Sequence, residues 1–247
     1  MAALLRAYRR GTRRSVLFTE LRNVSDLDDL QPVLDQNRFV YEEHLNFLID
    51  LEQPEEAIWR KISKSGRQCV RTSRNKGTVI EEVTVREKLA VAYRLLQGVY
   101  TRVQVPLASP TLFEAAFDVL GPQGMFKVFT ARVDGQDVGA LLVLLHQGRL
   151  ITWYGGSDRA FARHYPMEAL MWHTMKWGKD HGFRVYDFGG AGKPDEDYGP
   201  RKFKAKFHGE LVGYGRNVCV HAPMRLELSR RSYAVLRPFW QKWTSES

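Results

Sequence analysis

Apolar residues spaced three or four positions apart predict a series of helices along the chain. Leu89 and Leu96 belong to one such set, within residues 85–101. Proline and glycine mark several helix ends, as Pro166 and Gly182 do around one helix. The predicted helices span residues 2–14, 54–62, 67–76, 85–101, 111–121, 166–182 and a basic C-terminal tail, 222–247.

Shorter apolar runs between turn residues predict strands. Asp134-Gly135 and Gln147-Gly148 are predicted to join three of them as consecutive hairpins. The strands are expected within residues 16–23, 38–51, 78–83, 126–157, 183–190 and 203–220. This order of helices and strands predicts an α+β fold on a mostly antiparallel sheet.

Lysines occupy every second position between residues 202 and 206. Alternate residues of a strand share a face, so the pattern predicts a strand with Lys202, Lys204 and Lys206 on one side. Phe203 and Phe207 would then face the core.

Three arginines are predicted to share one face of the helix at 67–76. Arg67, Arg71 and Arg74 follow the spacing i, i+4 and i+7. Such a face is either solvated or binds an anion that relieves the repulsion between the arginines.

The charge balance favours an anionic partner. The chain of 247 residues has a formal net charge of +9 and a pI near 9.6. Its two cysteines form no disulfide or metal-binding pattern. The longest apolar run, residues 138–145, is too short to span a bilayer, and the N-terminus lacks the apolar core of a secretory signal. We therefore expect a cytoplasmic protein without a bound metal.

The residues also resemble a known family. The element order is similar to the GNAT acyltransferase fold, and several segments resemble the Fem family of aminoacyl-tRNA-dependent peptidyltransferases, which build peptidoglycan cross-bridges. These segments include "LFTELRN", "IDLEQPEEAIWRKISKSGRQCVRTSRNKGTVIEEV", "GSDRAFARHYPMEALMWHTMKWGKDHGFRVYDFGG" and "FKAKFHGELV", within residues 17–221.

The resemblance implies a domain organisation. It implies a partial first GNAT-like domain over residues 1–80, a complete GNAT-like domain over 81–221 and a C-terminal basic helix over 222–247. The family's long helical hairpin has no counterpart here, because no sustained heptad pattern follows Gly77.

The resemblance also implies an acyl-transfer site at Phe203 and Lys204. The Lys204 ammonium would stabilise the oxyanion formed when an amine attacks an ester, or would hold the 3′-terminal phosphate of a tRNA. Without the resemblance, a strand lysine is more often a solvated edge residue.

Asp187 is a candidate proton acceptor or orienting group at a strand end, where turn or cap roles are also common. The candidate substrate-binding residues are Arg67, Arg71, Arg74, Arg102, Tyr186, Gly189 and Gly190. His164 and His173 are expected to be packed or exposed rather than catalytic.

The function implied by the resemblance is N-acyl transfer. An aminoacyl group would pass from aminoacyl-tRNA to an amine of a nucleotide- or lipid-linked peptidoglycan precursor or a related acceptor, with no cofactor. Acetyl-coenzyme A transfer is the first alternative, but "ARHYPMEA" lacks the glycines that hold a pyrophosphate at a helix N-terminus. The second alternative is a non-catalytic RNA- or partner-binding protein.

Overall fold

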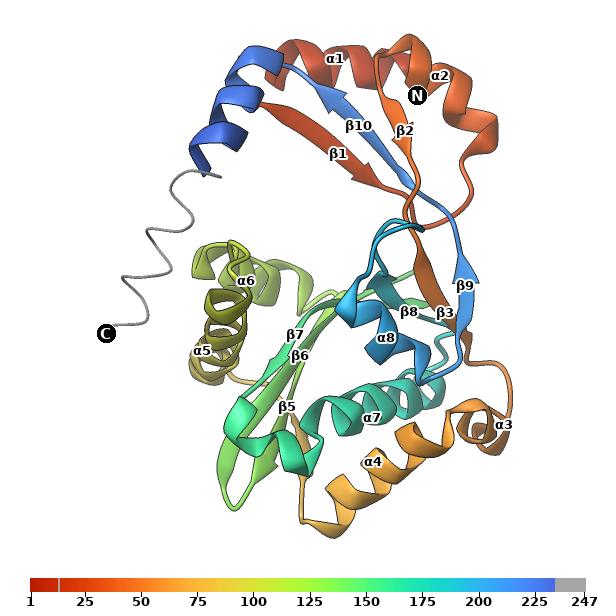
Figure 1. The fold of residues 1–247 in the computed structure, drawn as a ribbon, viewed down its shortest axis with the longest axis vertical. Coiled ribbons are helices and arrows are strands. Elements are labelled where there is room, and N and C mark those ends of the chain that lie inside the picture. The colour runs from red at the N-terminus through yellow and green to blue at the C-terminus, as the bar shows by residue number, and fades with distance from the viewer. Residues whose placement is uncertain (13, 234–247) are drawn as a thin grey trace. The chain divides into compact units, whose positions relative to one another are not determined.

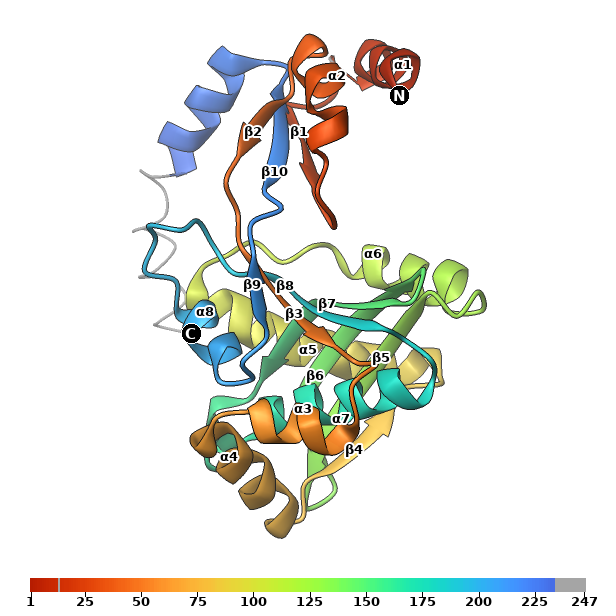
Figure 2. The same ribbon diagram turned by 90° about the vertical axis from the view of Figure 1, so that its right-hand side faces the viewer.

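The computed structural model describes residues 1–12 and 14–233, which form two compact units (Figures 1 and 2). One unit combines residues 1–45 with those from 213 onwards, and the other is the continuous stretch 46–212. These limits differ from the predicted ones, 80 and 221, because of strand pairing. β3 (Asn46–Asp50) pairs with strands of the second unit, whereas β10 (Arg216–Val220) pairs with strands of the first.

The first unit is a three-stranded antiparallel sheet, in the order β1-β10-β2, with short helices. Leu5, Leu34, Phe39 and Cys219 form its buried core. Its other elements are α1 (Ala2–Thr12), β1 (Phe18–Arg22), η1 (Asp28–Leu30), α2 (Gln31–Gln36), β2 (Val40–Glu42) and a helix over 223–233. The predicted C-terminal helix is thus present up to residue 233, and the rest of that prediction lies outside the described residues.

The second unit contains a seven-stranded sheet in the order β4-β5-β6-β7-β8-β3-β9. All its neighbouring strands are antiparallel except β7 and β8, which are parallel. The strands are β4 (Val79–Glu82), β5 (Phe126–Val133), β6 (Gln136–His146), β7 (Arg149–Ser157), β8 (Val185–Gly190) and β9 (Glu210–Val212), besides β3. The predicted α+β fold with a mixed, mostly antiparallel sheet is confirmed.

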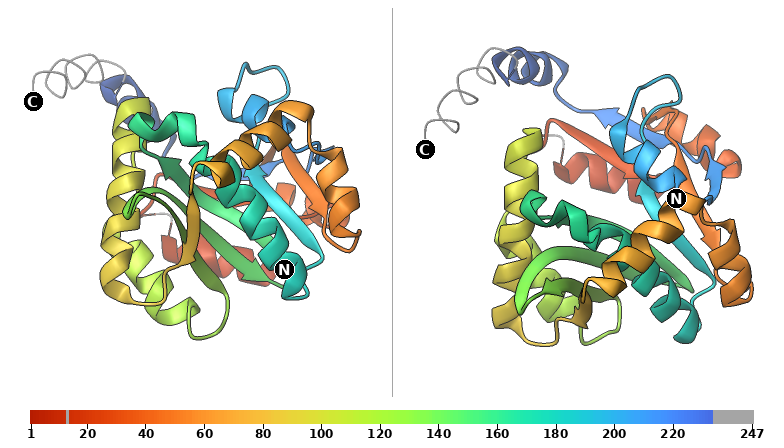
Figure 3. Two further views of the ribbon diagram at one scale, coloured as in Figure 1. Left: turned by 90° about the horizontal axis from the view of Figure 1, so that it is seen from below. Right: turned by 60° about the horizontal axis from the view of Figure 1, so that its bottom comes forward.

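Helices cover both faces of this sheet (Figure 3). On β5, Phe126 and Val128 belong to a core that includes Leu96 of α5 and Phe113 of α6, whereas Phe129 contacts rings of α7 on the other face. The helices are α3 (Glu55–Lys61), α4 (Lys64–Asn75), α5 (Arg86–Val103), α6 (Pro110–Ala115), η2 (Ala116–Leu120), η3 (Arg159–His164), α7 (Pro166–Asp180) and α8 (Gly199–Ala205).

The predicted strand at residues 202–207 is wrong, because this segment forms α8 and the turn after it. Pro200 occupies the first turn of α8, where a proline is well tolerated. The rings of Phe203 and Phe207 lie 5.9 Å apart, as residues four positions apart on a helix can. A spacing of four residues also places two side chains on one face of a strand, so the aromatic pattern fitted both structures.

Candidate functional site

The parallel strands β7 and β8 stop pairing before either strand ends. Their ladder runs from Arg149 and Val185 to Ile151 and Asp187, whereas β7 continues to Ser157 and β8 to Gly190. Backbone groups beyond a ladder need other partners, and the carboxyl ends of parallel strands are a common place for a ligand. Most of the predicted catalytic residues lie around this end of β8.

Lys204 reaches this strand end from α8. Its Nζ donates a hydrogen bond of 2.8 Å to the carbonyl oxygen of Gly190. Burial lowers the pKa of Lys204 to about 8. The negative charge of Asp187 raises this pKa, but by less than burial lowers it. Lys204 is therefore an ammonium in a poorly solvated position, mostly charged at neutral pH.

Asp187 is fully buried within β8 and is held by three donors. Its carboxylate accepts hydrogen bonds from Arg149 Nη1 at 3.1 Å, Asn46 Nδ2 at 3.2 Å and the Gly189 amide at 2.8 Å. Burial raises the pKa of Asp187, while these three donors oppose the rise. The arrangement suits a residue that orients the end of β8.

Gly189 and Gly190 form the end of β8 beside Lys204. Gly189 has φ of +67°, and a Cβ there would lie 3.0 Å from the carbonyl oxygen of Thr152 on β7. A larger residue would therefore strain the backbone and press on β7. Gly190 supplies the carbonyl that accepts the Lys204 hydrogen bond.

Tyr186 is not available to a substrate, and its prediction is corrected. The side chain is fully buried, and its hydroxyl lies 3.0 Å from Thr174 Oγ1 and 3.1 Å from Met171 Sδ of α7. Burial raises the pKa of Tyr186. Period-two alternation points Tyr186 to the α7 face and the neighbouring Asp187 to the other.

Phe203 and Lys204 diverge, because successive residues of a helix point about 100° apart. Phe203 packs against Phe207, and Lys206 Nζ lies 5.4 Å from the centre of its ring. The structure thus gives Phe203 packing contacts, and its catalytic assignment stays a prediction.

The three lysines of this segment are not equivalent, contrary to the predicted shared face. Lys202 is exposed and pairs with Asp197 at 2.8 Å. Lys206 pairs with the buried Glu168, in the first turn of α7, at 3.2 Å. Only Lys204, of these three, reaches the Gly190 carbonyl.

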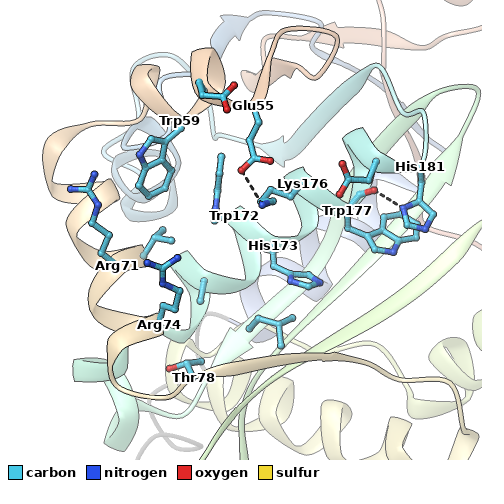
Figure 4. Close-up of a pocket in the computed structure, with 15 residues that line it drawn as sticks. Glu55, Trp59, Arg71, Arg74, Thr78, Trp172, His173, Lys176, Trp177 and His181 are labelled. Atoms are coloured by element: carbon cyan, nitrogen blue, oxygen red, sulfur yellow. Dashed lines mark hydrogen bonds and ion pairs between the residues drawn. The ribbon is translucent and has the colours of Figure 1, made fainter.

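The arginine face of α4 also divides. Arg67 Nη1 donates to the carbonyl oxygens of Arg60 at 2.7 Å and of Ile62, so it closes the C-terminal end of α3. Arg67 therefore has structural contacts, and its assignment to substrate binding stays a prediction. Arg71 and Arg74 are exposed and line a cavity between α3, α4, β4 and α7 (Figure 4).

The remaining candidates lie apart from these contacts. Arg102 is exposed in the last turn of α5, and its role in substrate binding stays a prediction. The His173 ring lies 5.7 Å from Phe129, and burial, followed by the charge of Lys176, lowers the pKa of His173. These contacts agree with the prediction that His173 is packed or exposed rather than catalytic. Within residues 1–12 and 14–233, no group of three or more histidines, cysteines or acids is placed to hold a metal ion.

Arg149, Asn46 and Glu168 were missed at the sequence level. A buried carboxylate needs partners, so a donor for Asp187 could be expected, but not identified. Arg149 and Asn46 are 38 and 141 residues from Asp187 in the chain, and only the order of strands β7-β8-β3 brings them together.

Comparison of structures shows which known folds the chain resembles. The crystal structure of FemX superposes with a TM-score of 0.71 at 16% identity, covering 92% of this chain and 78% of that one. The C-terminal domain of a putative lysylphosphatidylglycerol synthetase from Agrobacterium fabrum gives 0.62 at 15% identity, covering 95% and 77%. L-PGS from Bacillus licheniformis gives 0.56 at 13% identity, covering 77% and 65%.

Comparison of sequences gives the family. No curated protein matches the chain. Residues 60–199, which contain β4 to β8, match the acetyltransferase (GNAT) domain, and this match covers more than half of the chain. The chain therefore belongs to the acetyltransferase (GNAT) domain family, with a fold similar to that of FemX.

Proposed function

We propose that this GNAT-type acyltransferase moves an aminoacyl group from aminoacyl-tRNA to an amine of a peptidoglycan precursor or a related acceptor, in the cytoplasm and without a cofactor. The amine nitrogen would attack the ester carbonyl carbon and form a tetrahedral oxyanion. Collapse of this intermediate would expel the ribose oxygen of the tRNA, which takes up a proton, and would leave an amide.

The observation that carries the proposal is the position of Lys204. Its ammonium is partly buried and lies at the open end of the β7–β8 ladder, held by the Gly190 carbonyl. A fixed positive charge in a poorly solvated site stabilises a developing oxyanion far better than the same charge in water. Gly189 allows β8 to lie close to Thr152 of β7, and Gly190 presents its carbonyl to Lys204.

Asp187 fits the role of a positioning residue in this reaction. Its oxygens accept hydrogen bonds from Arg149, Asn46 and the Gly189 amide, so it holds the turn that presents Gly190. Its charge also favours the protonated form of Lys204.

The start of α7 argues against acetyl-coenzyme A as the donor. A pyrophosphate usually binds free amides at a helix N-terminus. Here Pro166 lacks its amide hydrogen, and the first turn contains the buried Glu168 carboxylate, which would repel a diphosphate. Lys206 forms an ion pair with this carboxylate, so its charge is already used and does not serve a diphosphate.

The similar structures support an aminoacyl donor only through their names. One of them is described as a putative lysylphosphatidylglycerol synthetase, a name that contains both an amino acid and a lipid, and another is FemX. None of them assigns the amino acid or the acceptor of this chain. None of the helices in its described part is long and apolar enough to cross a membrane.

The test compares the two donors directly. We expect tRNA to bind in a filter assay and acetyl-coenzyme A to give no saturable heat in calorimetry up to high micromolar concentration. Purified aminoacyl-tRNA with an amine acceptor should then yield an amide product. Saturable coenzyme A binding with acetyl transfer to an amine would reject the proposal in favour of an ordinary acetyltransferase.

A further inference from the structure

The second unit contains a cavity of about 730 Å³ that none of the residues around Lys204 lines (Figure 4). Its walls come from α3, α4, β4 and α7. This volume lies within the range of small-molecule sites, 300–1,000 Å³, in which aromatic walls combine with a few polar groups.

Three tryptophans line the cavity: Trp59 and Trp172, which contact each other, and Trp177, which stacks on His181. Trp59 of α3 and Trp172 of α7 are half-buried, with ring centres 4.8 Å apart and planes tilted by 52°. The Arg71 guanidinium lies 5.5 Å from the centre of the Trp59 ring. Tryptophan faces with an arginine beside them bind planar aromatic groups by stacking and cation–π contact.

The charged groups of the cavity are separated. Figure 4 shows Arg71 and Arg74 together on α4, and Glu55 beside Lys176 beyond the Trp172 ring. Lys176 and Glu55 form an ion pair of 2.9 Å. The exposed carboxylate of Glu56 lines the same region. The two arginines thus suit an anion, whereas the carboxylates, of which Glu55 is paired with Lys176, suit hydrogen-bond donors.

The arrangement is more specific than a solvated basic helix face. Solvation would account for the arginines, but it does not account for three half-buried tryptophans at the wall of the cavity. An apolar ligand would match the tryptophans, but it would leave the six charged side chains that line the cavity without a contact. A planar ring with an anionic substituent matches both sets of residues.

We propose that this cavity binds a nucleotide, with the base on Trp59 and Trp172 and the phosphate on Arg71 and Arg74. An exocyclic amine of the base would point toward the carboxylates, which accept hydrogen bonds from such amines. The nucleotide is either free or one unit of an RNA strand. This site is separate from the acyl-transfer site at Lys204, and its test does not require acyl transfer.

Calorimetry on the full chain tests the ligand chemistry. AMP should bind with one site per chain, whereas adenosine and inorganic phosphate should each bind at least about tenfold more weakly, since each lacks one of the two contacts. UMP should bind more weakly than CMP because uracil has no exocyclic amine. Adenosine binding as tightly as AMP, or no AMP binding up to about 10 mM, would reject the site.

Variants locate the binding. Arg71→Gln should weaken AMP binding about tenfold, and the double variant Arg71→Gln/Arg74→Gln about a hundredfold, because charge-assisted hydrogen bonds to phosphate are lost. The matched control is Arg94→Gln on α5, which removes the same charge from the opposite face of the sheet and should change affinity less than about twofold. Equal losses in Arg71→Gln and Arg94→Gln would show a diffuse charge effect and overturn the proposal.

The variant Trp59→Leu removes stacking without changing charge, and we expect it to weaken AMP binding about tenfold. Because Trp59 also packs on Trp172, the thermal unfolding of the Trp59→Leu variant is compared with that of the parent protein. The arginine variants change exposed side chains, so they test binding independently of folding. A short oligoadenylate distinguishes the two sources of the nucleotide. If the oligoadenylate binds much more tightly than AMP, and the same variants lose this binding, the ligand is an RNA strand. If the two bind equally tightly, the ligand is a free nucleotide.

Discussion

At the scale of single residues, Lys204 differs from its two neighbouring lysines in its partners. It is the lysine of this segment that contacts the Gly190 carbonyl, whereas Lys202 is exposed on Asp197 and Lys206 is bound to Glu168. An oxyanion contact acts only within hydrogen-bond reach, so the three lysines should not be interchangeable.

We expect Lys204→Met to lower the single-turnover rate of acyl transfer about a hundredfold, which corresponds to the loss of one oxyanion donor. The methionine keeps most of the apolar packing of the lysine stem, so folding should persist. Lys202→Met is the control and should change the rate less than about fivefold. Equal, small effects in both variants would remove Lys204 from the mechanism.

The lowered pKa of Lys204 predicts a pH dependence. With a pKa of about 8, the side chain is mostly protonated at pH 7 and mostly neutral at pH 9, so its contribution should disappear as the pH rises. The rate ratio of the parent protein to Lys204→Met should therefore fall about tenfold between pH 7 and pH 9. Titration of the acceptor amine affects the rates of both proteins equally, so it does not change this ratio. A ratio independent of pH would contradict a charged role for Lys204.

At the scale of elements, β7 lies so close to α5 that it requires glycine. A Cβ on Gly156 would lie 2.7 Å from Cγ2 and 3.2 Å from Cβ of Val99, a β-branched side chain that has little freedom to move. On α5 itself, a Cβ on Gly98 would meet no atom within 4 Å.

Two alanine substitutions should therefore have opposite effects. Gly156→Ala should lower the free energy of unfolding by about 1–3 kcal/mol through overpacking. Gly98→Ala, in an exposed helix position, should raise it by about 0.5–1 kcal/mol. Urea denaturation followed by circular dichroism measures both, and destabilisation by Gly98→Ala would contradict the described packing of α5.

The ion pair between Lys206, at the end of α8, and Glu168 of α7 gives a second prediction at this scale. Lys206→Met leaves the buried Glu168 carboxylate unpaired and should cost about 1–2 kcal/mol, less than a fully buried pair because Lys206 is partly exposed. Adding Glu168→Gln should recover most of this loss. Additive losses in the double-mutant cycle would show that the two side chains do not interact.

At the scale of the whole molecule, the second unit has the properties of an independently folding domain. It is one continuous stretch with its own core, and its first and last residues, Asn46 and Val212, are paired in the register of β3 and β9. The first unit, in contrast, needs residues from both ends of the chain.

We expect a fragment of residues 46–212 to unfold in a single cooperative transition, because no strand of its sheet depends on the other unit. The same fragment should keep AMP binding in calorimetry. Near-ultraviolet circular dichroism and thermal unfolding measure the outcome. Loss of the near-ultraviolet signal would show that the second unit depends on the first.

Most elements and both hairpin turns were predictable because their causes are local. Asp134-Gly135 and Gln147-Gly148 have positive φ at all four residues, and this conformation is typical of the turn type their sequence suggests. The family resemblance, and with it Lys204 and Asp187, was also visible in short segments. The strand predicted at 202–207 failed because Phe203 and Phe207 fit a strand and a helix equally well.

The sequence by itself thus determined the α+β class and the hairpins, since each depends on neighbouring positions, and its resemblance to known segments gave the family. Only the tertiary structure decided which side chains meet. It joined Asp187 to Arg149 and Asn46, buried Tyr186 away from any substrate, and placed two tryptophans beside Arg71 and Arg74. These contacts depend on strand order and helix packing between distant segments, which local patterns of hydrophobicity and spacing do not encode.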